Sequence, residues 1–85
     1  MPATIGEMIR AARVARGWSQ TELVIQLRAA GVDANGGGVS KWECGHIRPS
    51  TRALAAMVNV LGLDPAEVLE AAGRWPGWSG DSRRS

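Results

Sequence analysis

The sequence has little of what a disulfide-linked, membrane-spanning or secreted protein needs. Its 85 residues include one cysteine, and phenylalanine and tyrosine are absent. Because Cys44 has no second cysteine to pair with, an internal disulfide is excluded and a reducing compartment is favoured. No apolar run approaches the roughly 20 residues that span a bilayer, and the N-terminus lacks the basic-then-apolar pattern of a secretory signal. We therefore expect a cytoplasmic protein that has no membrane partner.

The side chains that usually carry catalysis are equally scarce. The chain has one histidine, His46, and it shows neither a serine–histidine–aspartate set nor the spacing of metal ligands. The glycine run Gly36–Gly38 is not a phosphate loop, because no Lys-Ser or Lys-Thr pair follows it at the required distance. The sequence therefore predicts a protein that is not an enzyme and that uses no cofactor, metal or small-molecule ligand.

The composition that remains is that of one small domain. Apolar residues make up 45% of the chain and charged residues 21%, which is enough for a packed core and a polar surface. The net charge is +2, and arginines gather near the start, at Arg10, Arg13 and Arg16, and at Arg83 and Arg84. Such a balance permits contacts with phosphate but is also common on an ordinary solvated surface, so charge alone leaves both interpretations open.

The clearest local patterns are helix starts. Thr4–Glu7 and Ser19–Glu22 both have the form of a capping box, in which a hydroxyl and a carboxylate satisfy each other's backbone N–H groups. Apolar residues follow each box at helical spacing, and glycines end both segments, at Gly17 and Gly31. Two further starts lie at Ser50 and at Asp64, which precedes a proline. These patterns predict helices that end near residues 62 and 73.

Between residues 32 and 38 the apolar period is lost and turn-forming residues dominate. A short third helix should begin in or just after Gly36–Gly38 and run to about Glu43, with Val39 and Trp42 turned inward. We therefore predict an all-α fold, with a five-helix domain over residues 1–73 and an extended C-terminal tail over residues 74–85. In that tail only Trp75 and Trp78 indicate docking.

An ordered set of residues in this chain resembles the Cro and lambda-repressor-like helix-turn-helix regulators, also called the xenobiotic-response-element type. The similarity runs from about residue 5 to residue 69. Its elements are Ile5-Gly6, Ile9-Arg10, Arg13, Gly17-Trp18-Ser19-Gln20, Glu22-Leu23, Val39-Ser40-Lys41-Trp42-Glu43, Gly45, Arg48-Pro49-Ser50, Leu54 and Leu61-Gly62-Leu63. The resemblance implies a compact five-helix domain whose third helix enters the DNA major groove.

The resemblance also implies roles for particular residues. Residues at the start of the second helix, here Gln20 and Thr21, would lie at the phosphate backbone, and Gln20 would also support the third helix. Ser40 and Lys41 would face base edges, since Lys can bond to guanine O6 and N7. Arg48 and, more weakly, His46 would hold phosphate from the following loop. For each of these residues the alternative is an ordinary solvated side chain.

One pair of charges is expected to serve the fold. Arg13 and Glu43 stand at positions that pair in similar proteins, where they tie the first helix to the third. We expect the same pair here, and so we do not count Arg13 as a DNA contact. If the two side chains were instead solvated separately, their interaction would be worth under about 1 kcal/mol.

The chain departs from the family at the turn before the third helix. This turn is about five residues longer than the compact form, and Gly36 and Gly37, preceded by Asn35, replace the usual polar side chains. In one explanation the backbone approaches DNA closely there, and Asn35 and Lys41 supply the readout. In the other the helix starts later and leaves a loop that orders on DNA. Both predict modest sequence specificity and strong salt dependence.

The four tryptophans divide into two pairs. Trp18 and Trp42 are expected at the edge of the core. Trp75 and Trp78 either cover an exposed apolar seam or form a dimer contact, and we favour the dimer contact, because a short member of this family needs a second subunit for affinity.

Taken together, the residues favour a sequence-specific regulator of transcription that binds double-stranded operator DNA. A repressor of the phage Cro-like or short bacterial type fits best, acting as a homodimer at least on DNA. Its compartment would be the cytoplasm of a bacterium or of a phage-infected host cell. The alternative is a helix-turn-helix adaptor or antitoxin-like module that binds protein and has little direct DNA readout, which the glycines favour.

Overall fold

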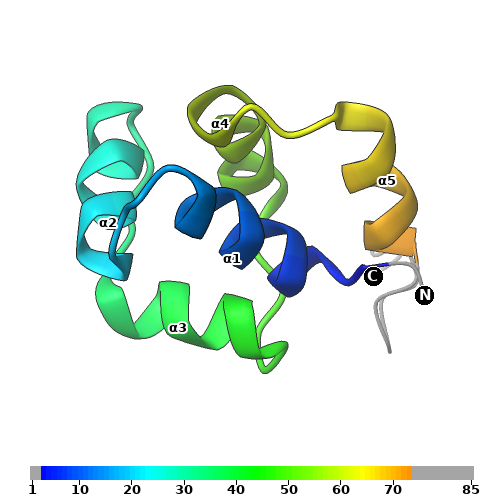
Figure 1. Cartoon of the computed structure of the whole chain (residues 1–85), viewed down its shortest axis with the longest axis horizontal. Helices are drawn as coiled ribbons and strands as arrows, with labels where there is room; N and C mark the ends of the chain where they lie inside the picture. The colour runs from blue at the N-terminus through cyan, green and yellow to red at the C-terminus, as the bar shows by residue number, and fades with distance from the viewer. Residues whose placement is uncertain (1–2, 74–85) are drawn as a thin grey trace.

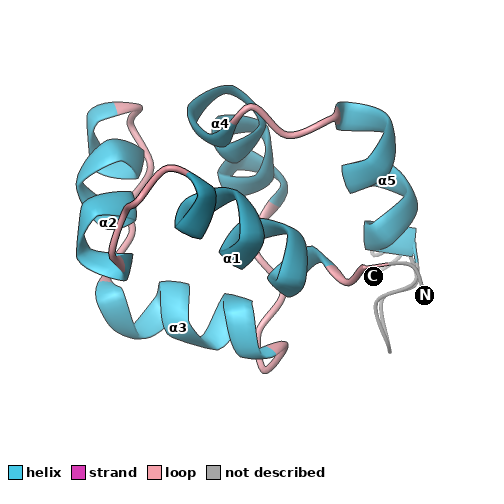
Figure 2. Ribbon diagram, in the orientation of Figure 1, coloured by secondary structure: helices cyan, strands magenta, loops and turns pink. Residues whose placement is uncertain are grey.

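In the computed structural model, which describes residues 3–73, five α-helices are joined by short loops (Figures 1 and 2). No strand occurs within that range. The helices are α1 (Ile5–Ala15), α2 (Gln20–Ala29), α3 (Gly36–Cys44), α4 (Thr51–Leu61) and α5 (Pro65–Gly73). The predicted all-α, five-helix fold is confirmed. The predicted tail over residues 74–85, with Trp75 and Trp78, lies outside the described residues.

Side-chain caps begin the helices where the sequence places them. The Thr4–Glu7 box is complete, because the Glu7 N–H donates to Thr4 Oγ1 at 3.1 Å and the Thr4 N–H donates to Glu7 Oε1 at 3.0 Å. Ser50 and Asp64 accept from backbone N–H groups in the first turns of α4 and α5. These four-residue patterns are local, so the sequence is sufficient to predict them.

The second box is only half formed. The Ser19 hydroxyl accepts from the Glu22 N–H at 3.1 Å, but the Glu22 carboxylate accepts from the Gln26 side chain at 3.4 Å, one helical turn further along. The prediction of a reciprocal box at this position was therefore wrong. A carboxylate in a first turn has partners on both sides, and here the i, i+4 amide competes with the backbone.

The start of α3 decides between the two explanations for the glycine segment. The helix begins at Gly36 itself, and Asn35 is its N-cap, with Asn35 Oδ1 accepting from the Gly38 N–H at 2.8 Å. The explanation in which the helix starts after the glycines was therefore wrong. A strong N-cap compensates here for three residues that have poor helix propensity.

The core lies where α1 crosses the other helices (Figure 1). Its fully buried side chains come from all of the first four helices: Ile5, Ile9, Leu23, Leu27, Val39 and Met57. Trp18 and Trp42 are partly buried and pack against this cluster, as predicted. The loop before α3 also enters the core, because Val32 and Ala34 are only 9% and 2% exposed. Residues 32–35 form a loop, as their turn-forming composition indicates, and the sequence pattern did not show that two of its side chains are buried.

Gly6 sets the distance between α1 and the end of α3. A Cβ atom at this position would lie 2.5 Å from the Trp42 carbonyl oxygen and 2.6 Å from the Glu43 carbonyl oxygen. Real side chains do not approach backbone so closely, so only glycine permits this crossing. The C-terminal half of α3 is therefore fixed against α1 by direct backbone contact.

Candidate functional site

The second and third helices, with the loop between them, form a bihelical unit at one side of the molecule. In Figure 1, α3 runs along the lower edge, beneath α1, and its first turn lies under α2, while α4 and α5 lie on the opposite side of α1. The loop over residues 30–35 is held to α2, because Arg28 Nε donates to the Ala34 carbonyl at 2.8 Å. Two core anchors and one charged hydrogen bond thus fix where α3 begins.

A hydrogen-bond network joins α1, α2 and α3, and Glu43 of α3 is its centre. Arg13 Nε and Nη2 donate to the two carboxylate oxygens of Glu43 at 2.7 and 3.1 Å. The Arg13 and Glu43 side chains are 12% and 5% exposed. The pair predicted from the sequence is therefore present, and it is a two-pronged, largely buried one, the strongest geometry for such a pair.

Arg13 has a third bond, from Nη1 to the Trp18 carbonyl at 2.8 Å, which ties the end of α1 to the start of α2. The hydrogen bond to Glu43 raises the pKa of Arg13 above its ordinary value, although burial opposes this effect. The guanidinium therefore stays charged at every physiological pH. Each of its three nitrogens donates one hydrogen bond within the fold.

Gln20 completes the network from the first turn of α2. Its Nε2 donates to Glu43 Oε1 at 3.1 Å. Because an ionised carboxylate only accepts, the amide nitrogen of Gln20 must face Glu43. The expected support of α3 by Gln20 is thus present in the structure, and the half-exposed side chain remains at the surface beside the exposed Thr21.

The outer face of α3 is a stripe of four predicted site residues, which we call the α3 outer stripe: Gly36, Gly37, Ser40 and Lys41. Helical spacing of three and four places them on one side, and the inward residues Val39 and Trp42 lie on the other, while Glu43, seven residues after Gly36, lies at the boundary between the two sides. Gly36, Gly37 and Lys41 are exposed and Ser40 is half-buried. The structure thus brings these residues together on a helix whose inner side is rigidly held.

The three glycines of α3 are not required by the packing of residues 3–73. A Cβ at Gly36 would meet nothing within 4 Å, and one at Gly37 or Gly38 would only touch Asn35 Oδ1 at 3.4 Å. None of the three has a positive φ. They therefore differ from Gly6, where the neighbouring backbone excludes a side chain.

The remaining predicted contacts follow the end of α3. His46 is exposed in the loop after the helix, and its N–H donates to the Lys41 carbonyl at 2.9 Å. Arg48 is half-buried, and the neighbouring Pro49 is fully buried, which anchors this loop. Asn35 is exposed before the helix, but its side-chain oxygen is occupied by the cap. Sequence reasoning missed this capping role, although asparagine just before a helix is its known signal.

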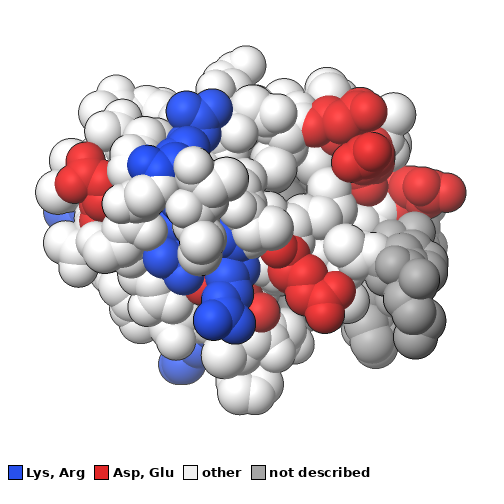
Figure 3. All heavy atoms as spheres, in the orientation of Figure 1, with Lys and Arg blue, Asp and Glu red and all other residues white. Residues whose placement is uncertain are grey.

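Charge is unevenly spread over the described surface. In the space-filling view of Figure 3, lysine and arginine run down the middle of the face, over α1, and the largest group of acidic side chains lies at the upper right, over α5, with smaller acidic patches at the left over α2 and at the lower centre. Several of the basic side chains are engaged within the fold, among them Arg13 with Glu43, Arg28 with the Ala34 carbonyl, and Arg16 with the ring of Trp18, 5.3 Å from its centroid. No cluster of metal-ligating side chains and no membrane-spanning helix occurs in residues 3–73.

Comparison with known proteins agrees with this geometry. A family model described as a helix-turn-helix domain matches residues 4–71, which is most of the chain and takes in α1 to α4 and all but the last two residues of α5. A search of curated proteins and a search of solved structures each find no match.

Proposed function

This chain belongs to the family of helix-turn-helix domains, and on that premise we propose that it is a sequence-specific, DNA-binding regulator of transcription. In this proposal α3 enters the major groove and the protein is a repressor of the phage Cro-like or short bacterial type, acting in the cytoplasm. The observation that carries the proposal is the α3 outer stripe, an exposed helix face whose inner side is fixed by Arg13, Glu43 and Gln20. A helix that is held in a fixed position on the domain surface can enter the DNA major groove without rearrangement of the protein.

The glycines of α3 support a close approach to DNA. Glycine costs roughly 1 kcal/mol relative to alanine in a helix interior, and in residues 3–73 a Cβ would meet open space at Gly36 and only Asn35 Oδ1, at 3.4 Å, at Gly37. A partner that needs this space is the simplest reason for their presence. A helix N-terminus without side chains brings its N–H groups and positive dipole end directly to phosphate or base edges.

The side chains around the glycines divide into two roles. Lys41 would bond to guanine O6 and N7, with Ser40 as a second base or phosphate contact. Gln20 and Thr21 at the start of α2, together with Arg48 and His46 after α3, would hold phosphate on either side. Asn35 contributes its amide N–H groups, because its oxygen caps the helix. With so few base-contacting side chains, specificity per copy would be modest and salt dependence strong.

Two copies would bind one operator. A single α3 spans few base pairs, and two such helices gain affinity when their half-sites lie about one helical turn, 10 to 10.5 base pairs, apart. The operator would then be close to palindromic.

The experiment that tests the function is binding of the purified chain to a mixed DNA pool at low and at physiological salt, by fluorescence anisotropy. We expect a preferred sequence to survive physiological salt. On that sequence Lys41→Ala should weaken binding by about 1 to 3 kcal/mol and reduce the salt slope by about one. Arg16→Ala is the matched control, because it also removes one positive charge, but from a residue that is not in α3 and lies against Trp18 and beside Gly62.

The result that would overturn the proposal is loss of all DNA binding at physiological salt. The alternative function, an adaptor or antitoxin-like module, would then be favoured. It is supported by one specific observation, the absence of side chains at Gly36 and Gly37, since a flat main-chain surface also suits a protein partner. The α3 outer stripe would be the first surface to test for such a partner.

A further inference from the structure

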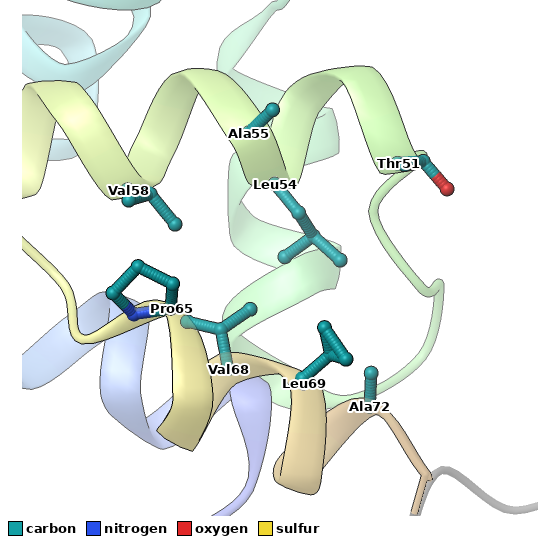
Figure 4. Close-up of a pocket in the computed structure, with 8 residues that line it drawn as sticks. All are labelled: Thr51, Leu54, Ala55, Val58, Pro65, Val68, Leu69 and Ala72. Carbon is teal, nitrogen blue, oxygen red and sulfur yellow. The ribbon is translucent and has the colours of Figure 1, made fainter.

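An apolar hollow of about 230 Å³ lies between α4 and α5, on a part of the molecule that the proposed function does not use (Figure 4). We call it the α4–α5 groove. Its walls are Leu54 and Val58 from α4 and Pro65, Val68, Leu69 and Ala72 from α5. Among the lining side chains, the hydroxyl of Thr51 is the one polar group, and it stands at the rim.

The groove is open in the described part of the chain. Leu69 is 72% exposed although its side chain points towards Leu54, and within residues 3–73 it is the most exposed of the large apolar side chains. Small-molecule pockets usually have about 300 to 1,000 Å³ and several convergent polar groups. This smaller and almost wholly apolar hollow therefore suits one large apolar side chain better than a metabolite.

Such a side chain is available immediately beyond α5. The helix ends at Gly73, one residue past the groove-lining Ala72, and the sequence continues as Arg74-Trp75-Pro76-Gly77-Trp78. Proline followed by glycine is the residue pair that the central positions of a type II turn prefer, and such a turn would reverse the chain between the two tryptophans. A reversal there would direct Trp78 back along α5.

The distances permit this return. Trp75 is three residues from Ala72, within roughly 10 Å at about 3.3 Å per residue, and a turn keeps the Cα atoms of Trp75 and Trp78 within about 7 Å, so Trp78 can lie up to roughly 17 Å from Ala72. Pro65 and Ala72 are seven residues apart on a helix, which is about 10 Å at 1.5 Å per residue. The indole of Trp78 can therefore reach any point of the groove.

The charges of the two partners are complementary. Asp64, Glu67 and Glu70 give the α5 region three acidic residues, and the α5 segment has no lysine or arginine. The segment over residues 74–85 has three arginines, Arg74, Arg83 and Arg84, against one acidic residue, Asp81. A basic segment that also holds two indoles fits an apolar groove on an acidic helix.

We propose that residues 74–85 fold back on their own domain and that the indole of Trp78 fills the α4–α5 groove, removing Leu69 from water. Trp78 would then extend the core, because an indole buries on the order of 150 to 250 Å². For Trp78 this proposal replaces the dimer contact favoured from the sequence alone, since a short connection gives intramolecular docking an effective concentration in the millimolar range. This assignment does not depend on DNA binding.

The test is a double-mutant cycle on the full chain, with urea unfolding followed by far-ultraviolet circular dichroism. We expect Trp78→Ala to raise the unfolding equilibrium constant about tenfold or more in the otherwise unchanged protein. In a Leu69→Asn background the same change should alter the unfolding equilibrium constant less than about twofold, because the polar Asn side chain has already removed the apolar surface that Trp78 would contact. Ile25→Asn is the matched background, since Ile25 is also an exposed apolar residue, 52% exposed, but on α2. There the tenfold effect should persist.

Two controls decide the occupant. Trp75→Ala should show no coupling with Leu69→Asn, and coupling of Leu69 to Trp75 but not to Trp78 would overturn the assignment. The coupling should also be the same at low and high protein concentration. Coupling that disappears on dilution would show that the groove binds a second copy, and absence of coupling altogether would show that the tail does not bind there. Either result would refute intramolecular docking.

Discussion

Arg13 and Glu43, which are 30 residues apart in the chain, are joined by two parallel hydrogen bonds of 2.7 and 3.1 Å. The same carboxylate accepts from Gln20, so α1, α2 and α3 meet at one acidic side chain. The position of the exposed helix face therefore depends on a charge cluster that faces inward. Breaking the cluster should affect both the stability of the fold and the placement of α3.

The first prediction concerns this pair. Glu43→Leu should lower the free energy of unfolding by about 3 kcal/mol, because it leaves the guanidinium of Arg13 without its partner in a site that is only 12% exposed. Arg13→Met combined with Glu43→Leu should recover more than half of that loss, since no unpaired charge remains. Urea unfolding of the two single variants and the double variant measures the coupling. Strictly additive losses would mean that the two side chains do not stabilise each other.

A second prediction follows from the contact between α1 and α3. Gly6→Ala should destabilise the domain by about 2 kcal/mol or more, although alanine favours helices by roughly 1 kcal/mol. The added Cβ would stand 2.5 and 2.6 Å from two backbone carbonyl oxygens, and backbone cannot yield as a flexible side chain can. Thermal or urea unfolding measures the loss. An unchanged midpoint would show that α1 can shift away from α3 without cost.

The helix caps could be predicted from the sequence, whereas the close contact at Gly6 could not. The caps at Thr4 and Ser50 join atoms three residues apart, so their patterns are visible in the sequence. The close contact at Gly6 and the burial of Val32 and Ala34 depend on elements that are distant in the chain. The local sequence pattern does not predict these features, because a loop residue is buried only when the packing of distant helices leaves space for its side chain.

The site shows the same division. The pairing of Arg13 with Glu43 was predicted through a family resemblance and is present, whereas the spacing of the two residues alone does not determine it. Asn35 was considered as a DNA contact, and its role as the cap of α3 became visible only once the first helical residue was fixed at Gly36. A cap is recognisable from sequence when an apolar period follows it, and here three glycines follow.

The third prediction separates the two roles of Asn35. Asn35→Ala should cost about 1 kcal/mol of stability, because the Gly38 N–H loses its acceptor. Asn35→Ser keeps the cap and should leave stability within about 0.5 kcal/mol, but it removes the amide N–H groups. If Asn35 also contacts DNA, the serine variant should bind the preferred operator several-fold more weakly at unchanged stability. Equal affinity of the serine variant and the parent would limit Asn35 to its structural role.

The last prediction uses the glycines to distinguish folding from binding. Gly36→Ala and Gly37→Ala should each raise the free energy of unfolding by about 0.4 to 1 kcal/mol, since the added methyl meets open space or an ordinary contact at 3.4 Å and restricts the unfolded chain. If DNA occupies the space beside the first turn of α3, the same two variants should bind the operator about tenfold more weakly, which corresponds to the loss of one good base or phosphate contact. Stability would then rise while affinity falls, an opposition that damage to the fold cannot produce.

Measuring both quantities on the same samples, by urea unfolding and fluorescence anisotropy, is decisive. Variants that gain stability and keep full affinity would show that no partner backbone approaches Gly36 or Gly37, and α3 would then have to contact DNA through Ser40 and Lys41 alone.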